Sequence, residues 1–346
     1  MSDTPARHSR RGLVIPFAIV GLLLAAWAGW WFYLSGQVQE RLATQIEALR
    51  ADGWRVSHEP VSVSGWPFRT RVAFPAADIV APSGHGVAAP ELVAEASAWN
   101  PGHWVVLAPD GLILTRAGKG QVAVEGEALR LSVSHLRDRF PDLRIELARP
   151  TFTPVAGADP FPLASAERIE LYTRPHLTDG EAATDEMDVL FRLTDGRGRT
   201  GGPVEGATRE GRLSAEVEAT IEQASRLRGM DSAGVFASWT AAGGRFTAVQ
   251  GRLQAGESSA RISSDALWAR EDGRLEGRLA LTAERPGDAI AGLAGSRSGA
   301  VNRVGAAGAA AAASVQGERP IDLVLLFSEG RTWLGPFALA PAPKLF

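Results

Sequence analysis

The hydrophobic and polar positions divide the chain into one long apolar run and a remainder in which short apolar pieces alternate with polar residues. Residues 12–34 carry no charged side chain. As a helix they span about 34 Å at a rise of 1.5 Å per residue, which is enough to cross the roughly 30 Å hydrocarbon core of a bilayer. The pattern therefore predicts one transmembrane helix over residues 12–34.

The residues on either side of this run predict its orientation. A basic cluster that includes Arg10 and Arg11 lies in the leader, residues 1–11, and such clusters favour the cytoplasmic side of a membrane. Aromatic residues that suit the opposite interface follow at the other end: Trp30, Trp31 and Tyr33. We therefore expect a single-pass protein with a cytoplasmic N-terminus and its C-terminal bulk across the membrane.

Two further questions about the apolar run stay open. Residues 26–28 (AWA) match the A-x-A pattern of a signal-peptide cleavage site, but cleavage there would expose a strongly apolar N-terminus, so we favour a retained anchor. Small residues at four-residue spacing allow two membrane helices to approach closely. Such a face is present here and predicts a weak homodimer, although small residues are common in membrane helices anyway: Gly21, Ala25 and Gly29.

A second helical pattern follows directly, over residues 35–53. Apolar side chains recur there at three- and four-residue spacing, with charged residues between them: Val38, Leu42, Ile46 and Leu49. This period predicts an amphipathic helix that ends at Gly53. Its polar face mixes glutamate and arginine, so we expect it to pack against the following domain and not to adsorb to a bilayer.

From Trp54 onward the period changes from helical to two. Short alternating pieces, bounded by Gly, Pro and Asp-Gly turns, recur almost to the end of the chain. This arrangement is typical of antiparallel hairpins and not of alternating β/α units. The predicted fold class is mainly β, an antiparallel meander that forms a curved or partly open sheet, with a few helices and the N-terminal transmembrane helix.

Composition divides the β region further. A stretch rich in Gly and Arg, residues 195–206, predicts a flexible connection between a first β-rich half, residues 54–194, and a second, residues 207–346. This stretch matches G-x-G-x-x-G, but we expect no helix after it, and a dinucleotide site needs one. Residues 287–317 are rich in Ala and Gly, which fits a loosely packed helix or a disordered insertion.

The overall composition excludes several kinds of site. The absence of cysteine excludes disulfides and thiolate-ligated zinc, and the near balance of 36 basic and 39 acidic residues argues against a nucleic-acid partner. The six histidines are scattered, without the spacing of a metal site. We predict no catalytic, cofactor-binding or metal-binding residue, and we favour a non-enzymatic role over an enzymatic one.

Aromatic residues at turns are the most distinctive local feature. In residues 61–68 a strand runs into Gly, Trp, Pro and Phe, and in residues 99–104 two indoles flank a turn. Such residues either plug corners of a sheet or line an apolar groove. The candidates for these corner or groove positions are Trp66, Pro67, Phe68, Trp99, Trp104, Trp239 and Trp268.

These aromatic motifs also carry a resemblance. The N-terminal anchor, VSGWPF at residues 63–68, WNPGH at 99–103 and LGPF at 334–337 resemble a family of Gram-negative envelope proteins catalogued as domain of unknown function 2125. The resemblance covers roughly residues 12–346 and implies an inner-membrane anchor with a periplasmic domain. The family has no assigned catalytic residue. Its layout is similar to that of AsmA-type proteins, some of which are implicated in lipid traffic between membranes.

Two classes of function fit these features of the sequence. The favoured one is a non-enzymatic protein, anchored in the inner membrane, whose sheet offers an apolar face to lipid or to an envelope partner. The alternatives are an envelope hydrolase that uses carboxylates not recognisable from sequence, and a structural subunit of an envelope complex. Fold-level similarity alone does not decide between them.

Overall fold

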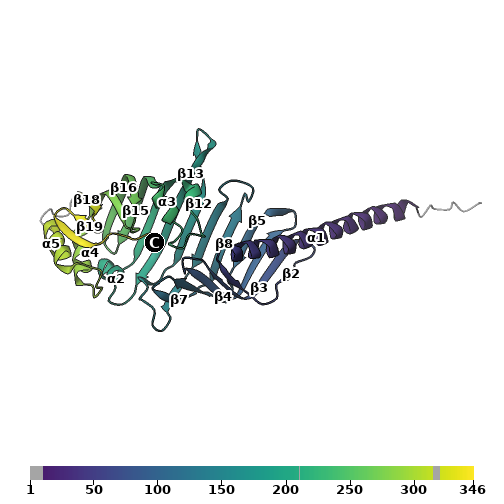
Figure 1. Ribbon diagram of the computed structural model, residues 1–346, viewed down its shortest axis with the longest axis horizontal. Helices are drawn as coiled ribbons and strands as arrows, with labels where there is room; N and C mark the ends of the chain where they lie inside the picture. Colours follow the sequence, from purple (N-terminus) through teal and green to yellow (C-terminus); the bar gives the residue numbers. More distant parts are fainter. Residues whose placement is uncertain (1–10, 210, 315–319) are drawn as a thin grey trace, which may run out of the picture.

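The computed structural model describes residues 11–209, 211–314 and 320–346, and one antiparallel sheet of 20 strands dominates it (Figure 1). The predicted mainly β fold class is therefore confirmed. The helices are α1 (Arg11–Ala51), α2 (Pro203–Thr208), the 3₁₀ helix η1 (Ala224–Arg226), α3 (Ala237–Ala241), α4 (Pro286–Gly295) and α5 (Arg303–Ser314).

The strands follow the predicted alternating pieces closely. Those of the first part are β1 (Arg55–Ser57), β2 (Ser62–Ser64), β3 (Arg69–Val80), β4 (Gly86–Ser97), β5 (Asn100–Leu107), β6 (Leu112–Arg116), β7 (Gly120–Glu125), β8 (Ala128–Ser134), β9 (Asp142–Ala148), β10 (Thr151–Pro154), β11 (Leu163–Ser165), β12 (Arg168–Thr178) and β13 (Glu181–Gly198). Those of the second part are β14 (Leu213–Glu222), β15 (Arg245–Ala255), β16 (Ser258–Ala269), β17 (Leu275–Glu284), β18 (Ile321–Ser328), β19 (Arg331–Leu334) and β20 (Phe337–Pro341).

α1 is one uninterrupted helix of 41 residues. The predicted transmembrane helix and the predicted amphipathic helix are its two parts, and no break separates them. By length and composition α1 is apolar enough to cross a membrane, with a mean hydropathy of 1.9 in its most apolar stretch, where only 6% is buried. Arg10 and the rest of residues 1–10 lie outside the described residues, as does the side chain of Arg11.

The sheet forms two layers in its first part. β4 pairs with both β5 and β6, and β13 pairs with both β12 and β11. Between these branch points, β5, β8, β9 and β12 make one layer, and β6, β7, β10 and β11 make the other. A hydrophobic core fills the space enclosed by this closed path of strands: Ala108, Val122, Val124, Leu129 and Phe152. The paired layers explain why short strands hold together here, since each buries one apolar face.

From β13 the sheet continues as one layer to β20, and helices cover parts of it. α4 and α5 pack over the last strands around a core of small and aliphatic side chains: Ile290, Ala306, Ala309, Ala310, Ala313, Ile321, Leu334 and Leu339. Of the two alternatives for the Ala/Gly-rich residues, the structure has the helical one: α4 and α5 are helices joined by residues 296–302, and both pack on the sheet. Residues 315–317 of that predicted insertion lie outside the described residues. Because the side chains between them are small, the helices lie close to the sheet, and few large apolar residues are needed to fill the space.

Residues 195–206 differ from the predicted flexible connection. They form the end of β13 and most of α2, and β13 pairs with strands on both sides, with a register shift between Leu193 and Gly196, so the sheet runs through this region. The glycines serve close packing: a Cβ on Gly198 would lie 2.2 Å from the backbone nitrogen of Glu205. Pro203 opens α2, where a helix tolerates proline. The expectation that no helix follows the G-x-G-x-x-G spacing was wrong, although α2 has only six residues.

The contact between α2 and α4 depends on two glycines and yields a testable prediction. A Cβ added to Gly292 would lie 1.9 Å from the carbonyl oxygen of Gly206, whereas nothing lies within 4 Å of one added to Gly295 in the same helix. We expect Gly292→Ala to destabilise the fold by about 1–3 kcal/mol through overpacking. Thermal unfolding of the full-length protein in detergent, followed by circular dichroism, measures the shift. Gly295→Ala is the matched control, and equal midpoints for the two variants would contradict the prediction.

Candidate functional site

The register of the sheet places an apolar row and a charged row on opposite faces of the same strands. Residues directly opposite each other in neighbouring antiparallel strands point to one face, and the next residue along each strand points to the other. Both rows cross the strands from β3 to β18 in the order β3, β4, β5, β8, β9, β12 and then β13 to β18. From β8 to β18 the two faces therefore carry opposite chemistry, whereas on β3, β4 and β5 the second row is apolar as well: Ala73, Val93 and Leu107.

The apolar row contributes one apolar residue or glycine from each of these strands. Its members are Val72, Ala94, Val106, Leu131, Ile145, Leu171, Phe191, Val217, Gly251, Ile262, Leu281 and Leu323. The row is buried near its start, where Val72 is 2% exposed, and again at Ile262, which is 7% exposed. Its middle is open.

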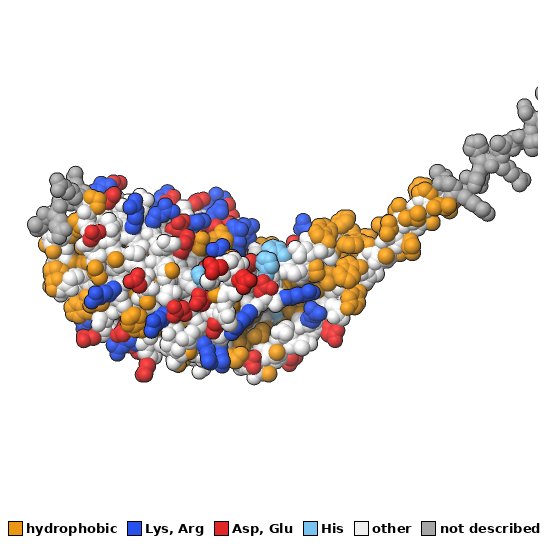
Figure 2. Space-filling view, turned by 90° about the horizontal axis from the view of Figure 1, so that it is seen from above, with side chains coloured by type: hydrophobic (Ala, Val, Ile, Leu, Met, Phe, Trp, Pro, Cys, Tyr) orange, Lys and Arg blue, Asp and Glu red, His pale blue; other side chains and the backbone are white. Residues whose placement is uncertain are grey.

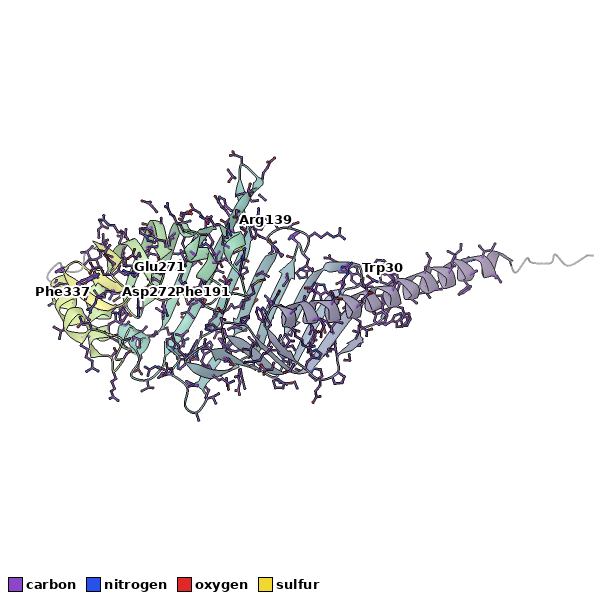
Figure 3. All side chains as sticks on the ribbon, in the orientation of Figure 1. Trp30, Arg139, Phe191, Glu271, Asp272 and Phe337 are labelled. Atoms are coloured by element: carbon purple, nitrogen blue, oxygen red, sulfur yellow. The ribbon has the colours of Figure 1, made fainter. Side chains whose placement is uncertain are left out.

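Three large apolar side chains form the open part, which we call the apolar patch: Leu143, Ile145 and Phe191, on β9 and β13, which are 38%, 37% and 37% exposed. Figure 3 shows Phe191 on the middle strands of the sheet. On one side the patch meets Val189, the next residue of β13 on this face, which packs in the cluster of Trp239. The patch is thus an uncovered continuation of the core.

The end of α1 lies on the same side of the sheet as the apolar patch. Trp54, which follows α1, lies 3.0 Å from the position of a Cβ on Gly229. Gly229 belongs to the segment between η1 and α3, whose side chains Leu227 and Phe236 pack against the apolar face. Figure 1 shows the second half of α1 crossing in front of the first strands, with α3 beyond it.

The charged row lies one residue along each strand from the apolar row. Its polar members are Arg130, Glu146, Glu170, Arg192, Glu216, Arg252, Arg261, Thr282 and Asp322. Neighbours in the row bind one another: Arg192 contacts Glu216 at 2.9 Å and Glu170 at 3.3 Å, and Arg252 contacts Glu216 at 2.7 Å. Ion pairs therefore link one strand to the next across the sheet.

Two glutamates of this row are buried directly opposite each other. Glu146 is 5% exposed and Glu170 is 4% exposed, and they form a cross-strand pair between β9 and β12. Like charges in that position repel and destabilise a sheet unless cations neutralise them. Arginines surround the pair and supply the opposite charge: Arg130, Arg144, Arg168 and Arg192.

Contacts with arginine and tyrosine keep the carboxylates of Glu170 and Glu216 ionised. Burial alone would raise the pKa of Glu170, but hydrogen bonds from Tyr172 and Arg192 outweigh it and hold that pKa below its ordinary value. Hydrogen bonds from Arg252 and Arg192 likewise hold the pKa of Glu216 below its ordinary value. Both groups are therefore bound as anions in the folded protein, and they act as fixed partners of arginine.

The charged face is the hollowed one. Grooves of about 530, 480 and 880 Å³ lie along it. The 880 Å³ groove crosses β5, β8, β9 and β12 to β15, and its lining includes His103, Arg130, Tyr172 and Asp188. Figure 2 shows basic and acidic side chains interspersed over the body of the molecule. Within the described ranges, no three His, Asp or Glu side chains converge so as to hold a metal ion.

Four of the corner or groove candidates from the sequence, three aromatic residues and Pro67, lie at the end of the sheet nearest the apolar half of α1. Trp66, Phe68 and Trp99 are 57%, 60% and 65% exposed there, and the rings of Phe68 and Trp99 lie 6.2 Å apart. Pro67 lies between the first two, and its carbonyl accepts a hydrogen bond from the indole of Trp27. We call Trp66, Phe68 and Trp99 the aromatic tip.

The remaining aromatic candidates lie elsewhere. Trp104 is half-buried on the apolar face, in the same cross-strand row as Leu143. Trp239 is fully buried, and its indole donates to the carbonyl of Glu222 at 2.7 Å. Trp268 is 41% exposed opposite Glu276, on the charged face. The structure thus does not bring all the candidates into one groove.

The small residues of α1 lie apart from both faces. Nothing lies within 4 Å of a Cβ added to Gly21 or Gly29, and Ala25 is exposed as well. The homodimer expected from their spacing stays a prediction.

The buried glutamates generate a prediction about pH. Because the pKa of Glu170 is lower in the folded than in the unfolded chain, its charge stabilises the fold above the unfolded value near 4.5, and that stabilisation is lost as pH falls through the folded value. We expect Glu170→Gln to lower the thermal midpoint at pH 7 by about 2–5 °C. The difference in thermal midpoint between this variant and the unsubstituted protein should become smaller below pH 4.5.

Glu271→Gln is the matched control, because Glu271 is exposed in the turn between β16 and β17 (Figure 3). Its midpoint should follow that of the original protein at every pH. A gap for Glu170→Gln that stays constant between pH 7 and pH 3.5 would contradict the role assigned to its charge.

Comparison with known proteins places the chain in a family. The family model described as an uncharacterized protein conserved in bacteria (DUF2125) matches residues 31–343. No curated protein and no solved structure matches the chain, and neither comparison connects it to AsmA-type proteins. The matched region begins at Trp31 and takes in every strand of the sheet. The chain therefore belongs to the DUF2125 family.

Proposed function

We propose that this protein is a single-span inner-membrane protein whose sheet lies in the periplasm and holds lipid acyl chains on its apolar patch. The apolar half of α1 supports the anchor, because residues 14–26 are exposed hydrophobic or small side chains over their whole circumference. The basic leader favours a cytoplasmic N-terminus. The sheet follows α1 in sequence and therefore lies on the opposite side of the membrane.

The apolar patch is the observation that carries the lipid proposal. Contiguous exposed apolar side chains on an otherwise polar surface mark binding sites, and covering apolar surface is favourable by roughly 25 cal/mol per Å². Leu143, Ile145 and Phe191 offer three such side chains. The charged row on the opposite face has no favourable interaction with an acyl chain, so we expect the chain to bind on the apolar face.

An acyl chain suits this patch because the apolar row joins it to the strands nearest the anchor. From β3 to β13 the row makes six strand-to-strand steps, or about 29 Å at 4.8 Å per step. A flexible aliphatic chain needs no hydrogen-bond partners and fits the exposed part of this face at Leu143, Ile145 and Phe191, whereas the row is buried at Val72. A protein partner would bring polar backbone groups, which need partners that the patch lacks.

The hydrolase alternative gains no support from Glu170 and Glu216 of the charged row. A glycosidase-type mechanism needs one carboxyl with a raised pKa as general acid. Glu170 and Glu216 have lowered pKa values, and arginine or tyrosine occupies their oxygens. Their arrangement suits a structural role, in which charge is neutralised within the sheet.

Site-specific photocrosslinking in native membranes tests the proposal. We expect benzoylphenylalanine in place of Phe191 to form adducts with the mass of a phospholipid, because an acyl chain lies against that position. The same group in place of Leu190, which is the preceding residue of β13 and faces the charged groove, should form about tenfold fewer, as expected for a difference of 1.4 kcal/mol.

A third position calibrates the measurement. Val20 is 52% exposed on the apolar half of α1, so benzoylphenylalanine there should crosslink to bilayer lipid. Lipid adducts at Val20 together with equal, low yields at Phe191 and Leu190 would overturn the lipid role of the patch and leave the anchor intact.

A further inference from the structure

The aromatic tip consists of three large side chains that the sheet does not bury. Trp66 and Phe68 come from the loop between β2 and β3, and Trp99 comes from the turn between β4 and β5. All three are more than half exposed. Burying these side chains in the protein would be favourable, yet both loops hold them in contact with solvent. Their apolar surface is therefore free to contact another molecule or a membrane.

Hydrogen bonds fix both loops to one short stretch of α1. The indole of Trp27 donates to the carbonyl of Pro67 at 2.9 Å, and the indole of Trp31 donates to that of Arg69 at 2.7 Å. On the other loop, the indole of Trp30 donates to the carbonyl of Ala98 at 3.2 Å. The tip therefore cannot move along α1 without losing these bonds.

A small core reinforces the same junction. Trp31 is 6% exposed, Leu34 is 9% exposed and Ala98 is fully buried, and the three pack together. Figure 2 shows hydrophobic side chains continuing from the helix onto the adjoining end of the body, and Figure 3 marks Trp30 at this junction. The aromatic tip and α1 form one continuous apolar surface.

The position of the junction along α1 sets its depth in a membrane. From Val14 to Trp31 the helix rises about 26 Å, which is close to the roughly 30 Å of a hydrocarbon core. The exposed aromatic residues Trp30, Phe32 and Tyr33 follow at the level where indole and phenol rings favour the interface. The two loops bonded to Trp27, Trp30 and Trp31 must lie at that same level.

We infer that the aromatic tip inserts into the interfacial layer of the leaflet from which α1 emerges, so that the near end of the sheet is seated on the bilayer. This inference rests on the proposed anchor, and it adds a second membrane contact that α1 alone does not supply. The partner is the lipid boundary between headgroups and acyl chains, which suits rings that are apolar with a polar edge.

The charges beside the tip agree with this partner. Arg69 and Arg71 have side chains that are 70% and 46% exposed, and both face a single acid, Glu95, at 3.4 and 3.7 Å. One positive charge of the three groups is left without a compensating acid among them. A surplus cation at headgroup level is attracted to phosphate groups.

Fluorescence quenching in vesicles tests the inference, and the cysteine-free chain allows a single label without background. The full-length protein carrying Phe68→Cys or Trp99→Cys is labelled with the fluorophore NBD. It is then reconstituted into vesicles of phosphatidylethanolamine and phosphatidylglycerol that contain nitroxide-labelled lipid. We expect both labels to lose about half or more of their emission, because the nitroxide lies in the layer that they enter.

Two controls separate this inference from the proposed function. Val304→Cys is 85% exposed on α5, far from the anchor, and should stay unquenched. Val20→Cys, on the apolar half of α1, should be quenched. If Val20→Cys is unquenched, the anchor itself is wrong. If Val20→Cys is quenched while both tip labels match Val304→Cys, the sheet does not touch the bilayer and the inference is overturned.

We expect the variants to fold, because the substituted side chains are exposed. Phe68 and Trp99 are exposed, so their replacement removes no core contact, and circular dichroism confirms an unchanged thermal midpoint. Trp66→Cys supplies a third tip position if either variant fails to fold. Quenching at any two tip positions supports the inference, and its absence at two overturns it.

Discussion

The register between neighbouring strands is the constraint on which the rest of the structure depends. Side chains alternate between faces with a period of two, so a slip of one residue in any strand would exchange its apolar and charged members. In β13 such a slip would move Phe191 into the position of Arg192, between Glu170 and Glu216. The buried glutamates would lose their cation and the apolar face would gain one. The ion pairs of the charged row therefore also specify which face is apolar.

The continuity of α1 is the second organising feature. A break after the apolar half would allow the sheet to swing freely, but the structure has one helix whose indoles bind two loops of the sheet. The half-buried positions beyond Trp31 then place the end of α1 over the apolar face. The same helix thus sets both the level of the near strands and the side on which the apolar patch lies.

The sequence predicted the element types well and their association poorly. Alternation in stretches such as residues 69–80 and 245–255 marks strands directly, because local periodicity needs no knowledge of partners. The charged row was missed although RIE at residues 144–146 and again at 168–170 places arginine and glutamate on one face of each strand. Only the pairing of β9 with β12 brings Glu146 opposite Glu170, and pairing is a long-range property that a single sequence does not display.

The prediction of a flexible connection at residues 195–206 was wrong for a related reason, because the role of its glycines depends on tertiary contacts. Gly198 and Gly206 indicate a linker by composition, whereas in the fold they allow α2 to approach β13 and α4.

The rows also make the sheet a long and stiff arm. Eleven steps between β3 and β18 extend it by up to about 50 Å from the end joined to α1. Transmembrane helices tilt as bilayer thickness changes, and a tilt of about 10° at the base would sweep the far end of such an arm through roughly 9 Å. Trp27, Trp30 and Trp31 bind the sheet directly to α1. A change in the tilt of α1 would therefore move helices α4 and α5 at the far end of the sheet. With α1 as the proposed membrane anchor, the tryptophan junction would convert a change in bilayer thickness into a displacement of the far end of the sheet.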